Sequence, residues 1–161
     1  MRHLTNEQVW KILEDVQDPE IPVISVVDLG LIRQVAVEAD RVLVVMTLTF
    51  AGCPALQVMR EEIARRLQEA GASQVEVRIT HKPPWSSDWI TEEGRRKLKD
   101  FGLAPPPRHN GAVELALQEA ARCPYCASQN TQLKNSFGPT LCRAIYVCND
   151  CRQPFEQFKP V

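Results

Sequence analysis

Cys123-Pro124-Tyr125-Cys126 and Cys148-Asn149-Asp150-Cys151 decide the fold of the C-terminal part of this chain of 161 residues. Each stretch is a C-x-x-C pair, and twenty-one residues separate the two pairs. A C-x-x-C pair can form a tight turn that presents two thiolates to one ion, and the residues between are enough for a hairpin that brings the turns together. We therefore predict that Cys123, Cys126, Cys148 and Cys151 bind one tetrahedral metal ion.

Zinc suits four thiolates because it has no d-electron preference for another geometry. Iron, as in a rubredoxin-like site, is the alternative metal, because four cysteine ligands by themselves do not distinguish it from zinc. Such a short segment buries too little surface to fold without help, so the metal would supply much of its folding energy. The alternatives are redox pairs or disulfides, and a redox motif needs only one C-x-x-C. Cys142 is a fifth thiol nearby, which we expect to be a buried core cysteine, with an exchangeable metal ligand as the alternative.

The composition is that of an ordinary globular protein, with 44% hydrophobic and 24% charged residues. No apolar run is long enough for a membrane span, and the N-terminal residues lack the apolar core of a signal peptide, so we expect a cytoplasmic protein. Residues 1–80 hold eight Lys/Arg and twelve Asp/Glu. This acidic balance argues against a nucleic-acid surface in the first half of the chain.

The first hundred residues predict a compact α/β domain. Thr5-Asn6-Glu7-Gln8 has the pattern of a capping box that begins a helix, and apolar residues at helical spacing continue to Asp18-Pro19. Residues 31–37 and 42–50 are rich in β-branched and apolar types and predict a β-hairpin. A second helix then leads to a strand over residues 75–79, parallel to the preceding strand. The expected order is αββαβ around a mixed sheet.

A proline-rich stretch divides the chain after this domain. We expect one more helix from Thr91 to about residue 101, followed by a stiff extended linker that contains Pro105-Pro106-Pro107. The stretch 112–121 fits either a short helix or a strand. The predicted domains are 1–104 for the α/β part, 105–120 for the linker and connecting segment, and 121–161 for the metal-binding ribbon.

Cys53 stands apart from the other cysteines, in Gly52-Cys53-Pro54. Proline favours the first position of a helix, so Cys53 should lie at or near the N-cap, where the helix dipole favours a thiolate. Such a thiol can act as a nucleophile or a soft-metal ligand, or can simply be a small half-buried residue. Nucleophilic catalysis would need a positioned base, and the histidines are scattered at His3, His81 and His109.

Three loop carboxylates, Asp18, Glu20 and Asp28, are candidates for the surroundings of Cys53. The same side chains can instead stop a helix or form turns, which is the safer interpretation for Asp18 and Asp28.

Several of these segments together resemble the small α/β domain of iron–sulfur cluster assembly factors, which include the SufT type and the eukaryotic cytosolic targeting factor. The segments are Asp18-Pro19-Glu20, Asp28-Leu29-Gly30, Thr47-Leu48-Thr49 and Gly52-Cys53-Pro54. The resemblance covers about residues 5–100. It implies that Cys53 is a transient cluster ligand and that Glu20 and Asp28 belong to the loops around it.

The remaining sequence resembles the family of D subunits of the phenylacetyl-CoA epoxidase system. The likeness is carried by the segments 85–98, 101–106, 137–144 and 154–159. It implies a non-catalytic accessory protein that assists iron–sulfur or iron centre assembly in a partner, either the oxygenase or the flavin and iron–sulfur reductase of that system. Zinc would be structural, the cluster would bind transiently, and a homodimer sharing a cluster stays open.

Two other functions remain in view. A docking protein would tether the oxygenase to the reductase, with Cys53 dispensable. A nucleic-acid-binding ribbon would use basic and aromatic residues to neutralise phosphates and stack on bases. These residues are Lys134, Arg143, Arg152, Lys159, Phe137, Tyr146, Phe155 and Phe158. Aromatic residues in a ribbon more often pack its hairpin, so we consider the nucleic-acid function the less favoured one.

Overall fold

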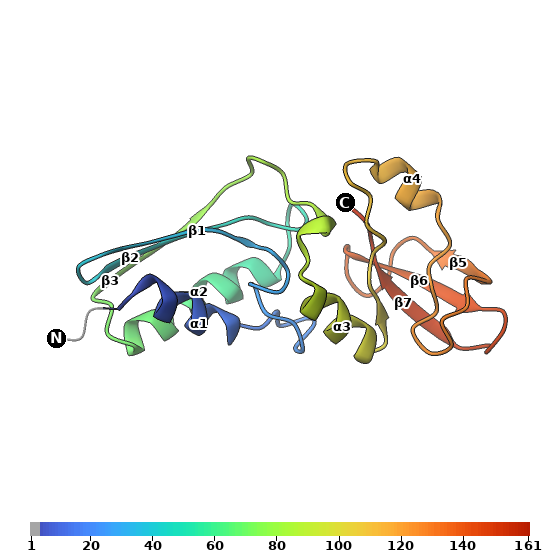
Figure 1. Ribbon diagram of the computed structural model, residues 1–161, viewed down its shortest axis with the longest axis horizontal. Coiled ribbons are helices and arrows are strands. Elements are labelled where there is room, and N and C mark those ends of the chain that lie inside the picture. Colours follow the sequence, from blue (N-terminus) through green and yellow to red (C-terminus); the bar gives the residue numbers. More distant parts are fainter. Residues whose placement is uncertain (1–3) are drawn as a thin grey trace. The chain divides into compact units, whose positions relative to one another are not determined.

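The computed structural model describes residues 4–161, and the chain forms two compact units (Figure 1). The first unit is Met1–Trp85 and the second unit is Ser86–Val161. His3 lies outside the described residues. Within residues 4–161, no helix combines the length and the apolar character needed to cross a membrane.

Helix α1 (Asn6–Glu14) begins at the predicted capping box. The Thr5 hydroxyl accepts a hydrogen bond from the Gln8 N–H at 3.2 Å, and the Gln8 side-chain oxygen accepts one from the Thr5 N–H at 2.9 Å. These bonds satisfy N–H groups that have no partner within the helix. Val9 and Leu13, four residues apart on one face, are fully buried, as the helical spacing predicts.

Strands β1 (Ile32–Glu38) and β2 (Arg41–Met46) form the predicted antiparallel hairpin. Alternate residues of β2, from Val42 to Met46, are fully buried, whereas the residues between them are half-buried. One face of the hairpin therefore packs into the core. We expected the second strand to reach residue 50, but it ends at Met46. It ends there because its last partners, Ile32 and Ile79, lie at the ends of the neighbouring strands.

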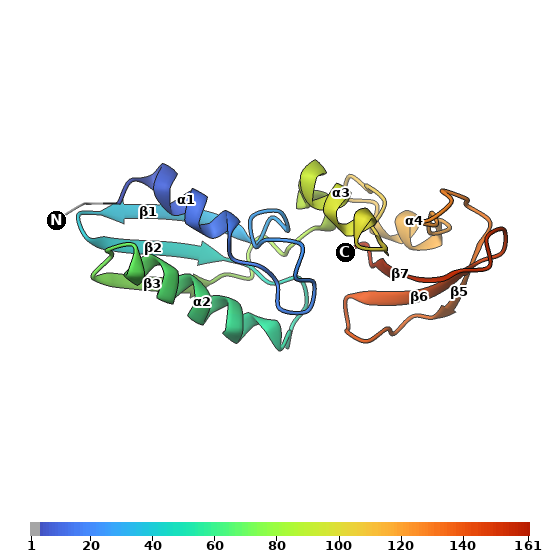
Figure 2. The same cartoon turned by 90° about the horizontal axis from the view of Figure 1, so that it is seen from below.

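Helix α2 (Ala55–Glu69) connects β2 to β3 (Gln74–Ile79), and these two strands are parallel as predicted. The sheet order is β1-β2-β3. Both α1 and α2 lie on one face of this sheet, which Figures 1 and 2 show from two sides. A fully buried stripe on α2, from Met59 through Ile63 to Leu67, packs on the sheet side. The unit therefore has the expected αββαβ order and mixed sheet.

The second unit contains a four-stranded sheet in the order β4-β7-β6-β5. Its strands are β4 (Leu103–Ala104), β5 (Thr131–Asn135), β6 (Arg143–Cys148) and β7 (Pro154–Phe158). β5, β6 and β7 form an antiparallel ribbon, and β4 pairs in parallel with β7. The helices are the 3-10 helix Ser87–Trp89, α3 (Glu92–Asp100) and α4 (Val113–Gln118). Within the undecided stretch 112–121, residues Val113–Gln118 are thus helical.

The boundary between the units lies after Trp85 rather than after residue 104. Leu103 and Ala104 pair with β7, so the segment that follows α3 belongs to the ribbon sheet. The Arg95 guanidinium on α3 donates to the backbone oxygens of Ser87 and Pro106, which fixes the proline stretch against the helix. Residues 105–120 are therefore part of a folded unit and not a free spacer.

Candidate metal centre and the Cys53 loop

Four cysteine sulfurs meet at one end of the ribbon in the second unit. The sulfurs of Cys123, Cys126, Cys148 and Cys151 all lie within 4.8 Å of one another. The Cys123–Cys151 pair is separated by 3.6 Å and the Cys126–Cys148 pair by 3.5 Å. A tetrahedral zinc ion with Zn–S bonds of about 2.3 Å would separate its sulfurs by about 3.8 Å. The donor set and its spacing therefore fit a four-thiolate zinc site.

The two C-x-x-C loops are built alike. In the first loop the Ala127 N–H donates to the Cys123 oxygen at 2.9 Å, and in the second the Arg152 N–H donates to the Cys148 oxygen at 3.0 Å. Ala127 and Arg152 hold equivalent positions and both have positive φ, 63° and 64°. This repeated turn directs two thiols from each loop toward the same point.

Backbone N–H groups polarise the thiols. The N–H groups of Cys151 and Asp150 donate to the Cys148 sulfur and lower the pKa of that thiol to about 7. The Gln153 N–H donates to Cys151, but burial and the neighbouring thiols outweigh it and raise the pKa of Cys151 to about 12. The backbone N–H groups thus favour the thiolate form of Cys148. A bound cation deprotonates its thiol ligands, so metal binding here releases protons.

Cys142 does not belong to the four-cysteine cluster. It directly precedes β6, whereas Cys148 ends that strand, so the two thiols lie at opposite ends. Its sulfur lies 3.0 Å from the Thr140 hydroxyl, and the residue is half-buried rather than fully buried as we expected. The strand β6 is therefore long enough to keep Cys142 away from the metal centre.

Cys53 lies in the loop between β2 and α2. The helix begins at Ala55 with Pro54 as N-cap, so Cys53 directly precedes the N-cap, near it as we predicted. Its N–H donates to the Phe50 oxygen and its oxygen accepts from the Leu56 N–H, both at 3.3 Å. The thiol is half-buried. This turn leaves the Cys53 thiol next to the positive end of a helix of fifteen residues.

Three loops of the first unit meet at the end of the sheet where β2 leads into the Cys53 loop. The Thr47 N–H donates to the Leu31 oxygen and the Thr80 N–H to the Met46 oxygen, each at 2.8 Å. The Trp85 indole N–H donates to the Leu29 oxygen at 2.9 Å. Segments 15–31, 47–54 and 80–85 therefore lie at one end of the sheet, as Figure 2 shows for the first two.

Asp28 and Glu20 lie in the first of these loops. The buried Asp28 carboxylate accepts from the Ser25 N–H at 3.2 Å, and the Ser25 hydroxyl accepts from the Asp28 N–H at 3.0 Å. The Asp18 carboxylate accepts from the Glu20 N–H at 2.7 Å and from the Ile21 N–H at 3.1 Å. Asp18 and Asp28 thus form turns, whereas Glu20 is half-buried. The structure brings Glu20, Asp28 and Cys53 to the same end of the first unit.

Two histidines, His81 and His109, lie within the described residues 4–161. His81 is exposed. His109 is buried in the second unit, where its Nδ1 accepts from the Gly111 N–H at 3.1 Å and its Nε2 donates to the Val161 oxygen at 3.0 Å. Both ring nitrogens of His109 therefore have backbone partners, which is typical of a structural histidine.

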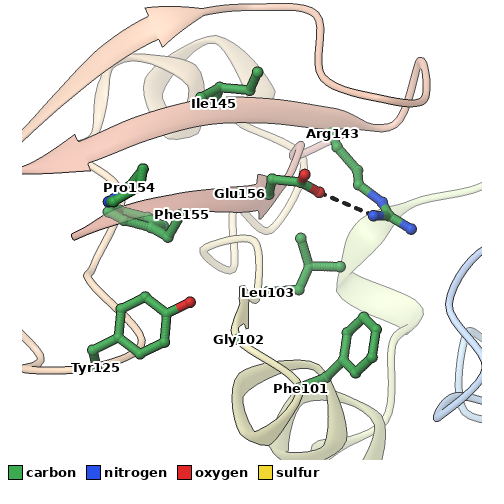
Figure 3. A pocket seen from close by; sticks show the side chains of 9 residues that line it. All are labelled: Phe101, Gly102, Leu103, Tyr125, Arg143, Ile145, Pro154, Phe155 and Glu156. Carbon is green, nitrogen blue, oxygen red and sulfur yellow. Dashed lines mark hydrogen bonds and ion pairs between the residues drawn. The ribbon is translucent and has the colours of Figure 1, made fainter.

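A cavity of about 390 Å³ opens beside the ribbon sheet (Figure 3). The rings of Phe101 and Tyr125 stand on one side of it, and the Arg143–Glu156 ion pair, at 2.9 Å, closes one end. The other lining residues are Gly102, Leu103, Ile145, Pro154 and Phe155. Phe101 and Tyr125 are about half exposed, at 47% and 58%. Sequence reasoning missed this cavity because it joins the end of α3, the first cysteine loop and β7.

Family models match both parts of the chain. Residues 6–79 match the model described as iron–sulfur cluster assembly protein, and residues 107–159 match the PaaD zinc beta ribbon domain. The fold and the four-cysteine centre thus define a two-part protein, an assembly-type α/β domain followed by a zinc ribbon.

More specifically, this chain belongs to the family of the phenylacetyl-CoA epoxidase D subunits. It is 37% identical over 152 residues to an Escherichia coli (strain K12) protein whose name assigns it as the D subunit of 1,2-phenylacetyl-CoA epoxidase. The match covers 94% of this chain and 91% of that relative. The resemblance noted from the sequence is therefore confirmed across both units.

Two shorter proteins resemble the N-terminal part. An Fe-S protein maturation auxiliary factor of Porphyromonas gingivalis (strain ATCC BAA-308 / W83) is 41% identical over 96 residues, which are 58% of this chain and 90% of that protein. The solved structure of a conserved hypothetical protein of Thermotoga maritima aligns with a TM-score of 0.53 and 30% identity, over 64% of this chain and 99% of that one. The maturation-factor relative and the family model of the N-terminal part support an accessory role in iron–sulfur protein assembly, and the solved structure supports the fold.

Proposed function

We propose that this chain is a non-catalytic accessory protein of the phenylacetyl-CoA epoxidase system in aerobic phenylacetate breakdown. It assists assembly of an iron–sulfur or iron centre in the oxygenase or the reductase of that system. The observation that carries the proposal is the position of Cys53, in a loop between a strand and a helix N-terminus with the Asp28 loop at the same end of the sheet. The family of the N-terminal part, iron–sulfur cluster assembly protein, supports the same role.

The chemistry of delivery favours a single thiol over a closed cage. Iron with open coordination positions binds a soft thiolate and can exchange it for a thiolate of the acceptor, whereas four thiolates around one ion leave no position open. The positive end of α2 favours the thiolate form of Cys53. Two chains could each give one thiolate to a shared cluster, so a homodimer belongs to the proposal.

Asp28 and Glu20 have different parts in this proposal. Asp28 is held by its reciprocal hydrogen bonds with Ser25, so it fixes the shape of its turn at the end of the sheet. Glu20 is half-buried on the same loop and is the carboxylate that we propose lies near a bound cluster. A cluster at this place would be cargo, and the zinc in the ribbon would stay with the chain.

Anaerobic reconstitution tests the role of Cys53. Wild type, Cys53→Ala and Cys142→Ala are incubated with iron and sulfide, and bound cluster is followed by visible absorption and by transfer to the metal-free reductase. Cys142 is a matched control because it too is a half-buried thiol outside the four-cysteine centre. We expect Cys53→Ala to lose cluster binding and transfer, Cys142→Ala to keep both, and all three chains to keep equal zinc.

Equal cluster binding and transfer by Cys53→Ala and wild type would refute the proposal. The thermal stability of each variant is measured alongside, and we expect the free energy of unfolding of Cys53→Ala to change by no more than about 1 kcal/mol because the side chain is small and half-buried.

A docking function is the second candidate, and the cavity in Figure 3 favours it. Phe101 and Tyr125 are large and about half exposed, and large exposed aromatic residues are frequent anchors in protein interfaces. The oxygenase or the reductase would place an apolar side chain between them. In a pull-down with the full chain, Tyr125→Ser should weaken capture of these proteins, while Leu115→Ser, an exposed apolar residue on α4, should not. Equal capture by both variants would exclude this cavity as the docking element.

Packing of the ribbon argues against the nucleic-acid function. Phe155 and Phe158 are buried, and Tyr146 stacks on Phe155 with ring centroids 5.7 Å apart. Arg143 is buried against Glu156, and the Lys159 ammonium lies over the Phe137 ring at 5.0 Å. Three of the four aromatic rings are thus used in packing within the ribbon, and Phe137 alone among them is an exposed large aromatic residue, so a continuous stacking surface for bases is not favoured.

A further inference from the structure

Polar side chains beside the metal centre join the two cysteine loops directly. Asp150, inside the second C-x-x-C, accepts hydrogen bonds from the Ser128 hydroxyl and, at 2.7 Å, from the Asn130 side-chain N–H. Ser128 and Asn130 follow the first C-x-x-C. The contact continues on the backbone, where the Asn149 N–H donates to the Asn130 oxygen at 2.9 Å. We call these four residues the loop brace: Ser128, Asn130, Asn149 and Asp150.

The loop brace is itself held in shape. The Ser128 hydroxyl accepts from the Asn130 N–H at 2.9 Å, and the Asn149 side-chain N–H donates to the Asn130 side-chain oxygen at 3.0 Å. The Asp150 carboxylate is thus an acceptor for the first loop, while the backbone N–H of the same residue faces the Cys148 sulfur.

Each cysteine loop is closed by its own backbone hydrogen bonds, and the pairing of Thr131 with Cys148 brings the start of β5 beside the second loop. The loop brace adds a side-chain contact between the loops themselves. A contact between the loops that does not pass through the metal holds the four sulfurs at binding distance and lowers the entropic cost of metal capture.

We infer that Asp150 is a positioning residue that clamps the two cysteine loops through Ser128 and Asn130 and so sets how long the ribbon retains zinc. The inference rests on the four-cysteine centre and is independent of the role proposed for Cys53. Partners of metal ligands typically change metal affinity by about 10- to 100-fold when they are removed. We therefore expect loss of the carboxylate to accelerate zinc release by at least about tenfold.

Zinc release from the full chain tests the inference. Zinc-loaded wild type, Asp150→Ala, Asp150→Asn, Ser128→Ala and Asp100→Ala are mixed with excess chelating dye, and the release rate is recorded. Asp100 is an exposed aspartate at the end of α3 and serves as the matched control. An amide at position 150 can still accept from Asn130 and can donate to the Ser128 hydroxyl. Asp150→Asn should therefore release zinc at a rate within about threefold of wild type. This result is expected if the hydrogen bonds of residue 150, and not its negative charge, hold the loops.

Two results support the clamp: Asp150→Ala releases zinc fast, and Asp150→Asn restores slow release. A third is that the double variant Ser128→Ala, Asp150→Ala releases zinc no faster than Asp150→Ala alone. The effects do not add because both side chains form one contact. The visible spectrum of the cobalt-substituted chains should remain that of a tetrahedral four-sulfur site in every variant. Release by Asp150→Ala at the rate of Asp100→Ala would overturn the inference. Equal acceleration by Asp150→Ala and Asp150→Asn would also overturn it, because charge alone would then account for the effect.

Discussion

Trp85→Phe should destabilise the first unit through one buried hydrogen bond. Trp85 is 4% exposed, and its indole N–H donates to the Leu29 oxygen at 2.9 Å, across fifty-six residues of sequence. Phenylalanine keeps an aromatic ring but has no donor, so the Leu29 oxygen is left buried without this partner. An unsatisfied buried acceptor costs about 1–3 kcal/mol, and the void left by the smaller ring adds about 1 kcal/mol.

The expected loss is therefore about 2–4 kcal/mol in the free energy of unfolding of the first unit. For a unit of this size, 1 kcal/mol corresponds to about 4–8 °C in melting temperature, so we expect a decrease of about 8 °C or more. Because Leu29 directly follows Asp28, the loop beside the proposed cluster site should also open more often than in wild type.

Hydrogen exchange with mass spectrometry measures both effects, because it follows peptides of each unit separately. Trp10→Phe is the matched control, since Trp10 is half-buried on α1, and we expect it to cost about 1 kcal/mol or less. Peptides that cover residues 25–31 should exchange faster only in Trp85→Phe. If Trp85→Phe and Trp10→Phe lower the free energy of unfolding of the first unit by amounts within about 0.5 kcal/mol of each other, the hydrogen bond to Leu29 does not hold the loop. That result would refute the reasoning.

Three further predictions concern the metal, the backbone and the surface charges. Chelation of zinc, or Cys123→Ser, should unfold the second unit while hydrogen exchange in the first stays unchanged. Arg152→Gly should stabilise the zinc-loaded second unit by about 0.5–1 kcal/mol in thermal melts, because glycine adopts positive φ without the strain of a side chain. Arg65 and Arg66 lower the pKa of Glu62 to about 2, so Glu62→Gln should cost about 0.5 kcal/mol at pH 7. That difference is present above the ordinary pKa of 4.5 and should disappear as the pH falls through 2.

Local signals in the sequence predicted the first unit well. The capping box at Thr5 and Gln8 needs only residues three apart, and the buried stripe of α2 needs only helical spacing. The parallel arrangement of β2 and β3 follows from the length of the helix between them. These features depend on neighbours in sequence, and this is why reasoning without a structure could find them.

Features that depend on distant residues were not predictable. The proline stretch has the composition of a linker, yet Pro106 is buried and Ala104 packs with the cysteine core. This packing follows from the pairing of β4 with β7, about fifty residues later in the chain. Asp150 likewise has the sequence context of an ordinary turn residue, and only the structure shows that it joins two loops. The four cysteines were the exception, because ligand type and spacing identify a metal site whatever lies between them.

The two cysteine sites of this chain differ in the property that decides whether a metal stays. In the second unit, four thiols converge from two loops that are closed by their own backbone and joined by the loop brace, so all positions of a tetrahedral ion are filled. Release from such a site needs several bonds to break together. In the first unit, Cys53 offers one thiol from a loop at a helix end. An iron centre held there has positions left for ligands of an acceptor, so exchange can proceed one bond at a time. The proposed function requires a chain that keeps one metal and passes on another, and separate sites in two units suit that requirement.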